Sequence, residues 1–218
     1  MKRILCLALL FTACDDGRDH AQAICALVDT SGTYRDQIDD AAAVLRTAVL
    51  PRMRPGDSLV VVRVDDNTYE KQNVDFALTL DNRPLRANQQ KAELANTLGT
   101  LGDRSGRARY TDISGGMMLC AEYLSEMRAG KKVMIAFSDM REDLPPGVAR
   151  RFDDHELQNM RVLAMNVKRL KQDSAQPAQY RARLAEWEHV VKAKGAPEWK
   201  VIIEPERLVA YLDDLRAN

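Results

Sequence analysis

Short apolar runs alternate with amphipathic segments along this chain, and the alternation predicts its secondary structure. Five apolar or valine-rich runs have the length and composition of buried parallel strands, and they cover 24–29, 58–64, 131–137, 161–167 and 199–203. In a sixth run, 73–80, the apolar residues Val74, Phe76, Leu78 and Leu80 occupy every second position. This period of two is typical of a half-exposed strand.

The segments between these runs have the apolar spacing of helices. In the first of them, Ile38, Ala41, Leu45 and Val49 fall on one helical face. The expected helices are 36–53, 86–101, the segment after Thr111, 147–157, 177–194 and 206–215. Strands that alternate with helices favour a parallel α/β sheet. We therefore expect a single doubly wound α/β domain with a mostly parallel central sheet and helices on both faces.

The N-terminus has the pattern of a bacterial lipoprotein signal peptide. Lys2 and Arg3 form a basic start, residues 4–11 are apolar, and Phe-Thr-Ala-Cys at 11–14 resembles a lipobox in which Cys14 becomes the lipidated first residue. The apolar stretch is shorter than the about 20 residues that a membrane-spanning helix needs. The alternative is the first strand of a cytosolic domain, but a strand explains neither the basic start nor the polar run at 15–20.

Asp15 and Asp16 follow the lipobox directly. They resemble the signal that retains a lipoprotein in the inner membrane, and a merely solvated tether is the alternative. The expected organisation is a signal peptide at 1–13, a lipidated tether at 14–23 and one domain at 24–218. We expect this domain to face the periplasm, anchored to the bacterial inner membrane by lipid.

The charge balance gives no argument for nucleic acid binding. The chain has 32 basic and 32 acidic residues, so losing Lys2 and Arg3 leaves 30 against 32, a net charge of −2. Binding to nucleic acid phosphates needs a basic surface, and the basic residues here are scattered. We expect no nucleic acid partner.

Two cysteines remain once Cys6 is removed and Cys14 carries lipid. Cys25 lies in the first predicted strand, and Cys120 lies in the helix predicted after Thr111. Both have apolar surroundings and can be buried free thiols, while an oxidising periplasm also permits a disulfide. The sequence leaves both alternatives open.

Polar residues with hard oxygen ligands stand at three places along the predicted fold. Asp29, Ser31 and Thr33 come directly after the first strand, Asp139 follows a later strand, and Thr111 precedes a helix. Ligands of an open parallel sheet bind at the carboxyl ends of its strands, so Asp29 and Asp139 are expected at the same edge. Carboxylates and hydroxyls are suitable ligands for Mg²⁺. The three segments together predict one magnesium site.

The order of these motifs resembles the von Willebrand factor type A (VWA) family and its metal-ion-dependent adhesion site. Residues 29–33 match the family motif D-x-S-x-S/T, and Thr111 lies where the family places an isolated threonine. Ser138 and Asp139 lie where the family has Ser-Asp-Gly, but Met140 replaces the glycine, which puts the backbone turn after Asp139 in question. The resemblance covers about residues 22–216 and implies that the half-exposed strand is an antiparallel edge strand.

The resemblance also implies roles for the site residues. Ser31 and Thr33 would bind Mg²⁺ (or Mn²⁺) directly, and Thr111 would bind it directly or through water. Asp29 and Asp139 would supply charge, partly through coordinated waters. Two carboxylates only just balance the charge of a divalent cation, and mostly neutral oxygens fill its inner shell. The metal therefore stays electrophilic and keeps an open coordination position, which a carboxylate from a protein partner can fill. The loop 102–110 and the segment around 145–146 flank this site and are expected to contribute partner specificity.

Three alternatives stand beside this interpretation. Asp29, Ser31 and Thr33 can simply cap the following helix. The chain can be an assembly subunit of an envelope, secretion or conjugation complex that needs no metal. It can also be a metal-dependent phosphohydrolase, but aspartate-nucleophile phosphatases carry a second Asp where this chain has Ser31. Because no nucleophile elbow, dinucleotide fingerprint or Walker loop is present, we expect that the chain is not an enzyme.

Overall fold

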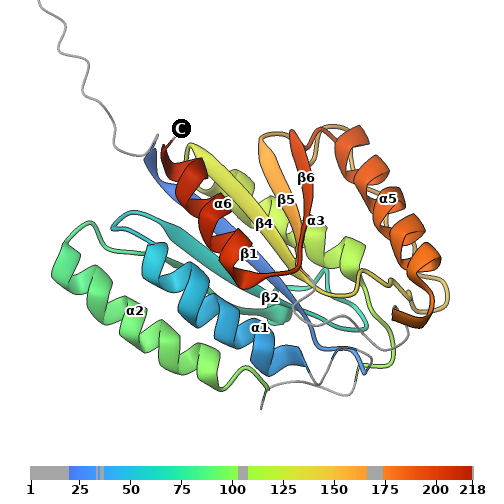
Figure 1. Ribbon diagram of the computed structural model, residues 1–218, viewed down its shortest axis with the longest axis horizontal. Helices are drawn as coiled ribbons and strands as arrows, with labels where there is room; N and C mark the ends of the chain where they lie inside the picture. The colour runs from blue at the N-terminus through green and yellow to red at the C-terminus, as the bar shows by residue number, and fades with distance from the viewer. Residues whose placement is uncertain (1–19, 33, 35–36, 103–107, 166–173, 218) are drawn as a thin grey trace, which may run out of the picture.

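A computed structural model describes residues 20–32, 34, 37–102, 108–165 and 174–217 as one α/β domain (Figure 1). Its strands are β1 (Gln22–Asp29), β2 (Ser58–Val64), β3 (Val74–Thr79), β4 (Lys131–Phe137), β5 (Met160–Met165) and β6 (Glu198–Ile202). They form one six-stranded sheet in the order β3-β2-β1-β4-β5-β6. All neighbours pair in parallel except β2 and β3. The expected fold class and the antiparallel edge strand are therefore confirmed.

The middle residues of the central strands are apolar because both faces of the sheet are covered. Alternate side chains of a strand point to opposite faces, and those of β1 enter two separate cores. Ile24 and Val28 pack into one core, while Cys25 and Leu27 pack into the other. This double burial explains why the predicted strands appear as unbroken apolar runs rather than alternating ones.

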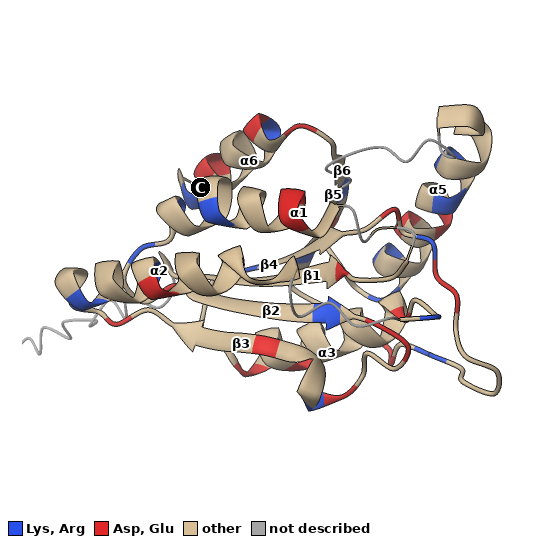
Figure 2. Ribbon diagram, turned by 90° about the horizontal axis from the view of Figure 1, so that it is seen from below, with Lys and Arg blue, Asp and Glu red and all other residues tan. Residues whose placement is uncertain are grey.

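Five helical regions cover the two faces. One face carries α1 (Ile38–Val44), which continues as π-helical η3 (Leu45–Val49) and 3₁₀-helical η4 (Leu50–Arg52), together with α2 (Pro84–Gly99) and α6 (Pro205–Ala217). The other face carries α3 (Ile113–Glu126) and α5 (Pro177–Ala193). Figure 2 shows α1 and α6 on one side of the sheet and α3 on the other. A short 3₁₀ turn, η5 (Lys71–Asn73), leads into β3.

The strand register aligns the ends of the central strands. Asp29 at the end of β1 lies beside Val64 at the end of β2, and Val28 lies beside Phe137 at the end of β4. The loops after these strands therefore start at one level, at an edge that we call the carboxyl edge. This is where an open parallel sheet binds its ligands.

The prediction of a helix at 147–157 is wrong. Residues 141–159, which we call the connecting segment, form turns and irregular backbone between β4 and β5. Gly147 and His155 have φ angles of 81° and 63°, which a right-handed helix does not contain. Phe152 is nevertheless buried, so the apolar residues that suggested a helix contact the core from an irregular backbone.

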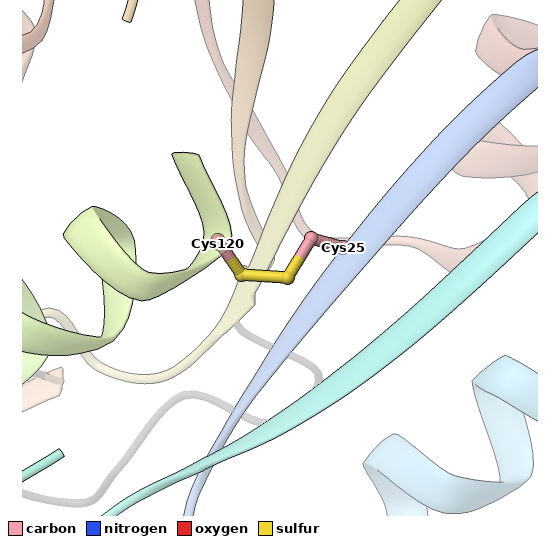
Figure 3. Close-up of a disulfide and its surroundings, with 2 residues drawn as sticks. All are labelled: Cys25 and Cys120. Carbon is pink, nitrogen blue, oxygen red and sulfur yellow. A yellow bond between two sulfur atoms is a disulfide. The ribbon is translucent and has the colours of Figure 1, made fainter. Parts of the chain in front are cut away.

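Cys25 and Cys120 form a disulfide between β1 and α3 (Figure 3). Their Cα atoms are 5.7 Å apart, and 95 positions separate them in the sequence. Both side chains are fully buried. Of the two alternatives left open by the sequence, the structure has the disulfide.

The other predicted elements agree with the structure to within a few residues, and β1 begins at Gln22, two residues earlier than expected. The signal peptide and Cys14 lie outside the described residues. Within the described part of the chain, none of the helices is both long and apolar enough to cross a membrane.

Candidate metal centre

Asp29 lies at the end of β1 with a fully buried side chain. Its Oδ1 accepts a hydrogen bond of 2.9 Å from the Ser31 amide, and its Oδ2 accepts one of 2.6 Å from the Ser138 hydroxyl. Ser138 follows β4, which is the strand next to β1. The first and third sequence motifs are therefore in direct contact at the carboxyl edge.

Burial raises the pKa of the Asp29 carboxyl from 3.8 to about 6. Hydrogen bonds from Ser138 and Ser31 lower the pKa, and the negative charge of Asp139 raises it further. An anionic carboxylate is therefore unfavourable at this position unless positive charge is added. A divalent cation would supply that charge.

The backbone turn after Asp139 closes without the glycine of the family motif. Asp139 is almost completely buried, and its Oδ1 accepts a hydrogen bond of 2.9 Å from the Arg141 amide. Met140 takes a left-handed conformation with a φ of 59°, and its amide donates a hydrogen bond of 3.0 Å to the Ser138 hydroxyl. The backbone turn after Asp139 therefore forms with Met140 in place of the glycine of the family motif.

Two backbone bridges bring the Thr111 segment to the same edge. Thr111 and Asp143 exchange amide-to-carbonyl hydrogen bonds of 2.7 and 3.0 Å, and Ala108 forms a parallel bridge with Ser31. Thr111 is therefore anchored to the connecting segment on one side, while Ala108 lies beside Ser31 of the first motif. Thr33, the remaining expected ligand, lies outside the described residues.

Asp112 caps the helix that Thr111 precedes. Its Oδ1 accepts a hydrogen bond of 2.8 Å from the Gly115 amide at the start of α3. A Cβ atom at Gly115 would collide with this carboxylate. The Thr68 amide donates a second hydrogen bond, of 2.9 Å, to Asp112 Oδ2. The glycine at position 115 is thus required by the cap rather than by a ligand.

Arg150 of the connecting segment helps to hold the candidate site together, and the sequence analysis did not identify it. Its Nε lies 3.1 Å from both carboxylate oxygens of Asp112, and its Nη2 lies 2.7 Å from Oδ2. Asp112 is fully buried, and the side chain of Arg150 is 15% exposed. This buried ion pair ties the connecting segment to the start of α3. No local sequence pattern could show it, because residue 150 lies in a stretch expected to be helical.

Glu142 makes a second link between the same two elements. Its carboxylate accepts hydrogen bonds from the Ser114 amide at 2.6 Å and from the Ser114 hydroxyl at 3.0 Å. Burial raises the pKa of Glu142, and the bonds from Ser114 lower it. Carboxylates at the first turn of a helix are stabilised by its free amides and its dipole. The position of Thr111 therefore depends on contacts made by residues 142 and 150.

A pocket of about 520 Å³ opens beside these residues, between α5 and the connecting segment. Met140, Phe152 and Trp187 supply apolar surface, and Arg151 and Glu186 supply charge. Because Met140 follows Asp139 directly, the pocket adjoins the candidate metal site.

The ligand atoms at the carboxyl edge fit Mg²⁺ or Mn²⁺ in their chemistry. They are carboxylate and hydroxyl oxygens, which hard divalent cations prefer. Among the described residues, no group of three or more His, Cys, Asp or Glu side chains is placed to hold a metal ion. A metal here would therefore be held by Asp29 and Asp139 with neutral hydroxyls from Ser31 and Thr111. In this ligand set the two carboxylates just balance the charge of a divalent cation, and the other ligands are neutral oxygens.

Comparisons with known proteins support the fold. No protein-family model matches the chain, and no curated protein sequence matches it either. Among solved structures, a von Willebrand factor type A protein from Catenulispora acidiphila superposes with a TM-score of 0.50 at 13% identity. That match covers 90% of this chain but only 42% of the other. The conserved hypothetical protein BatB from Bacteroides thetaiotaomicron matches with a TM-score of 0.54 at 10% identity, over 91% of this chain and 100% of the other. At these identities the similarity extends to the fold, and the chain therefore has the von Willebrand factor type A fold.

Proposed function

We propose that this chain is a protein-binding domain that holds Mg²⁺ (or Mn²⁺) at its carboxyl edge and binds a protein partner through that metal. Asp29, Ser31, Thr111 and Asp139 would hold the ion, with Thr33 as a further ligand. A lipid on Cys14 would keep the domain at the periplasmic face of the bacterial inner membrane.

One observation carries the proposal: two buried carboxylates lie at the ends of neighbouring strands, and one of them is hydrogen-bonded to the residue directly before the other. Asp29 accepts a hydrogen bond from Ser138, which immediately precedes Asp139. Asp29 and Asp139 are each at most 1% exposed. Burying two negative charges close together is unfavourable unless a cation is also bound. A helix cap alone does not explain why two carboxylates are buried near each other, because capping one helix needs only one acceptor.

The bound ion would supply a Lewis-acidic position for an oxygen ligand from outside the chain. Asp29 and Asp139 together carry two negative charges, and hydroxyl ligands add none. An acidic side chain of a partner could therefore bind the ion with a net electrostatic gain. The pocket beside Met140 and the loops at 102–110 and 145–146 would contribute further contacts with that partner. Binding of this kind requires no catalytic group.

The first experiment is isothermal titration of the full chain, in detergent, with Mg²⁺ and with Mn²⁺. Wild type is compared with Asp29→Ala and with Asp213→Ala, whose carboxylate is exposed and pairs with Arg52 at 3.3 Å. We expect saturable binding in wild type and in Asp213→Ala, and none in Asp29→Ala. Envelope extracts are then passed over immobilised wild type in Mg²⁺ and in EDTA. The partner should be retained only with Mg²⁺, and not by Asp29→Ala.

Other outcomes would select the alternatives. A folded wild type that binds neither ion, and retains the same partner in EDTA as in Mg²⁺, would indicate a metal-independent assembly subunit. Hydrolysis of p-nitrophenyl phosphate by wild type, lost in Asp29→Ala, would indicate a phosphohydrolase.

A further inference from the structure

The turn at Asp139–Met140 has an unfavourable backbone conformation that the surrounding structure must maintain. Met140 is one of three non-glycine residues with a positive φ among the described residues. Left-handed backbone is disfavoured for a residue with a Cβ, and it persists only where its neighbours enforce it. The direction of the Asp139 carboxylate depends on this turn, since the Arg141 amide at its end donates a hydrogen bond of 2.9 Å to Asp139 Oδ1.

Two side chains of α5 hold the turn by its carbonyl groups. The Arg183 Nε donates a hydrogen bond of 2.9 Å to the Asp139 carbonyl oxygen. The Trp187 indole Nε1 donates one of 2.9 Å to the Met140 carbonyl oxygen. Both peptide units that follow Asp139 are therefore fixed by a helix that contributes no residue to the sequence motifs.

The two donors are themselves well ordered by packing. Trp187 is 8% exposed and belongs to the core on that face of the sheet, as does the buried side chain of Met140. The Arg183 guanidinium stacks over the Tyr180 ring, with 5.3 Å to the centroid. A donor that is fixed in this way constrains its acceptor, so α5 can impose the conformation of the turn.

We propose that Trp187 and Arg183 are positioning residues of the metal site. They hold Met140 in the left-handed conformation and thereby aim the Asp139 carboxylate at the ion. The inference rests on the proposed function, because it assigns these residues a role toward the metal held by Asp139. The proposal thus assigns helix α5 a role in a site that is otherwise formed by strand ends and loops.

The test compares Trp187→Phe with Trp199→Phe in the full chain. Both tryptophans are 8% exposed, and each change keeps an aromatic ring while removing the indole N–H. We expect Trp187→Phe to weaken Mg²⁺ binding about tenfold in isothermal titration, the lower end of the usual effect of removing a hydrogen bond behind a metal ligand. Trp199→Phe should leave the affinity unchanged. The unfolding midpoint in EDTA is measured for both, so that a general loss of stability is recognised.

A second variant tests the mechanism directly. Glycine adopts positive φ without strain, so Met140→Gly should make the turn independent of its donors. In the Met140→Gly background, Trp187→Phe should therefore reduce Mg²⁺ affinity by much less than tenfold. Arg183→Met should weaken binding in the wild-type background, and Arg183→Lys, which retains a donor, should restore part of the loss.

The outcomes separate this inference from the function on which it rests. If wild type binds Mg²⁺ and Trp187→Phe binds it equally well, the positioning role is overturned and the metal site stands. An equal loss from Trp187→Phe in the wild-type and Met140→Gly backgrounds would overturn the role through the backbone turn. If wild type binds no Mg²⁺ or Mn²⁺, the proposed function fails and the positioning role fails with it.

Discussion

The Ser138 hydroxyl donates a hydrogen bond of 2.6 Å to the buried carboxylate of Asp29, across the gap between two neighbouring parallel strands. The same hydroxyl oxygen accepts the Met140 amide at 3.0 Å. Ser138 therefore connects the first motif of the candidate site with the turn that orients the third.

Replacing Ser138 with alanine should lower the stability of the metal-free domain. Asp29 would remain buried without one of the donors that offset its charge, and a hydrogen bond to a charged group contributes about 1.5–3 kcal/mol. We expect a decrease of this size in the free energy of unfolding, measured with urea at pH 7.5 in EDTA.

The matched control for this change is Ser125→Ala. Ser125 is exposed, and its hydroxyl bonds only to the Glu122 carbonyl of the same helix in the described structure. Exposed substitutions of this kind usually change stability by less than about 0.5 kcal/mol. Equal effects of the two alanine variants would show that the bond between Ser138 and Asp29 contributes little.

The sequence predicted those parts of the fold whose local pattern and tertiary environment agree. Strands β2 and β4 begin and end at the predicted residues, 58–64 and 131–137, because burial on both faces makes their middle residues consecutively apolar. The convergence of Asp29 with Ser138 could also be predicted, since parallel strands end at one edge.

The parts that could not be predicted depend on long-range contacts. Residues 147–157 have apolar residues at nearly helical spacing, but Arg150 pairs with Asp112, 38 positions away, and this contact holds the segment in an irregular conformation. The turn at Met140 depends in the same way on Trp187, 47 positions away. The sequence allowed the bond between Cys25 and Cys120 but could not establish it, because pairing depends on how α3 packs over β1.

Breaking the Arg150–Asp112 pair should be strongly destabilising. Arg150→Met keeps most of the side-chain volume but leaves the fully buried Asp112 carboxylate without its counter-ion. Removing one partner of a buried pair typically lowers stability by about 3–5 kcal/mol. We expect this decrease in urea unfolding, together with weaker Mg²⁺ binding, since the pair anchors the helix start beside Thr111.

Arg52→Met provides the comparison for this prediction. Arg52 pairs with Asp213 at 3.3 Å, but the two side chains are 28% and 59% exposed. Such pairs contribute about 0–1 kcal/mol, so this variant should unfold nearly as wild type does. A loss in Arg150→Met no larger than in Arg52→Met would contradict the assignment of the buried pair.

The disulfide should stabilise the domain by restricting the unfolded chain. Cys25 and Cys120 close a loop with a sequence separation of 95, and bridges of this kind contribute about 2–5 kcal/mol. The double variant Cys25→Ala, Cys120→Ala should lose stability in this range. Dithiothreitol should destabilise wild type, once the bridge becomes accessible, and leave the double variant unaffected. Reaction of both cysteines of unreduced wild type, unfolded in urea, with a thiol reagent would show that the bridge does not form.

The burial of Asp29 predicts a characteristic dependence of stability on pH in the absence of divalent cations. Its pKa is about 6 in the folded state and 3.8 ordinarily, so the folded state binds the proton more tightly. Stability is then lost as the pH rises from 3.8 to 6, and the full loss is present above that window. The shift corresponds to about 3 kcal/mol at pH 7.5. Asp29→Asn, which does not ionise, should therefore be more stable than wild type in EDTA at pH 7.5, by up to this amount.

Two further conditions make this prediction decisive. At pH 5 the advantage of Asp29→Asn over wild type should shrink to about half, because most of the folded wild type then carries the proton on Asp29. Saturating Mg²⁺ at pH 7.5 should raise the unfolding midpoint of wild type and not that of the variant, since an ion that binds only the folded state stabilises it by mass action. An advantage that stays constant between pH 5 and 7.5 would show that Asp29 titrates normally. The carboxylate would then bear no free-energy penalty for a bound cation to offset.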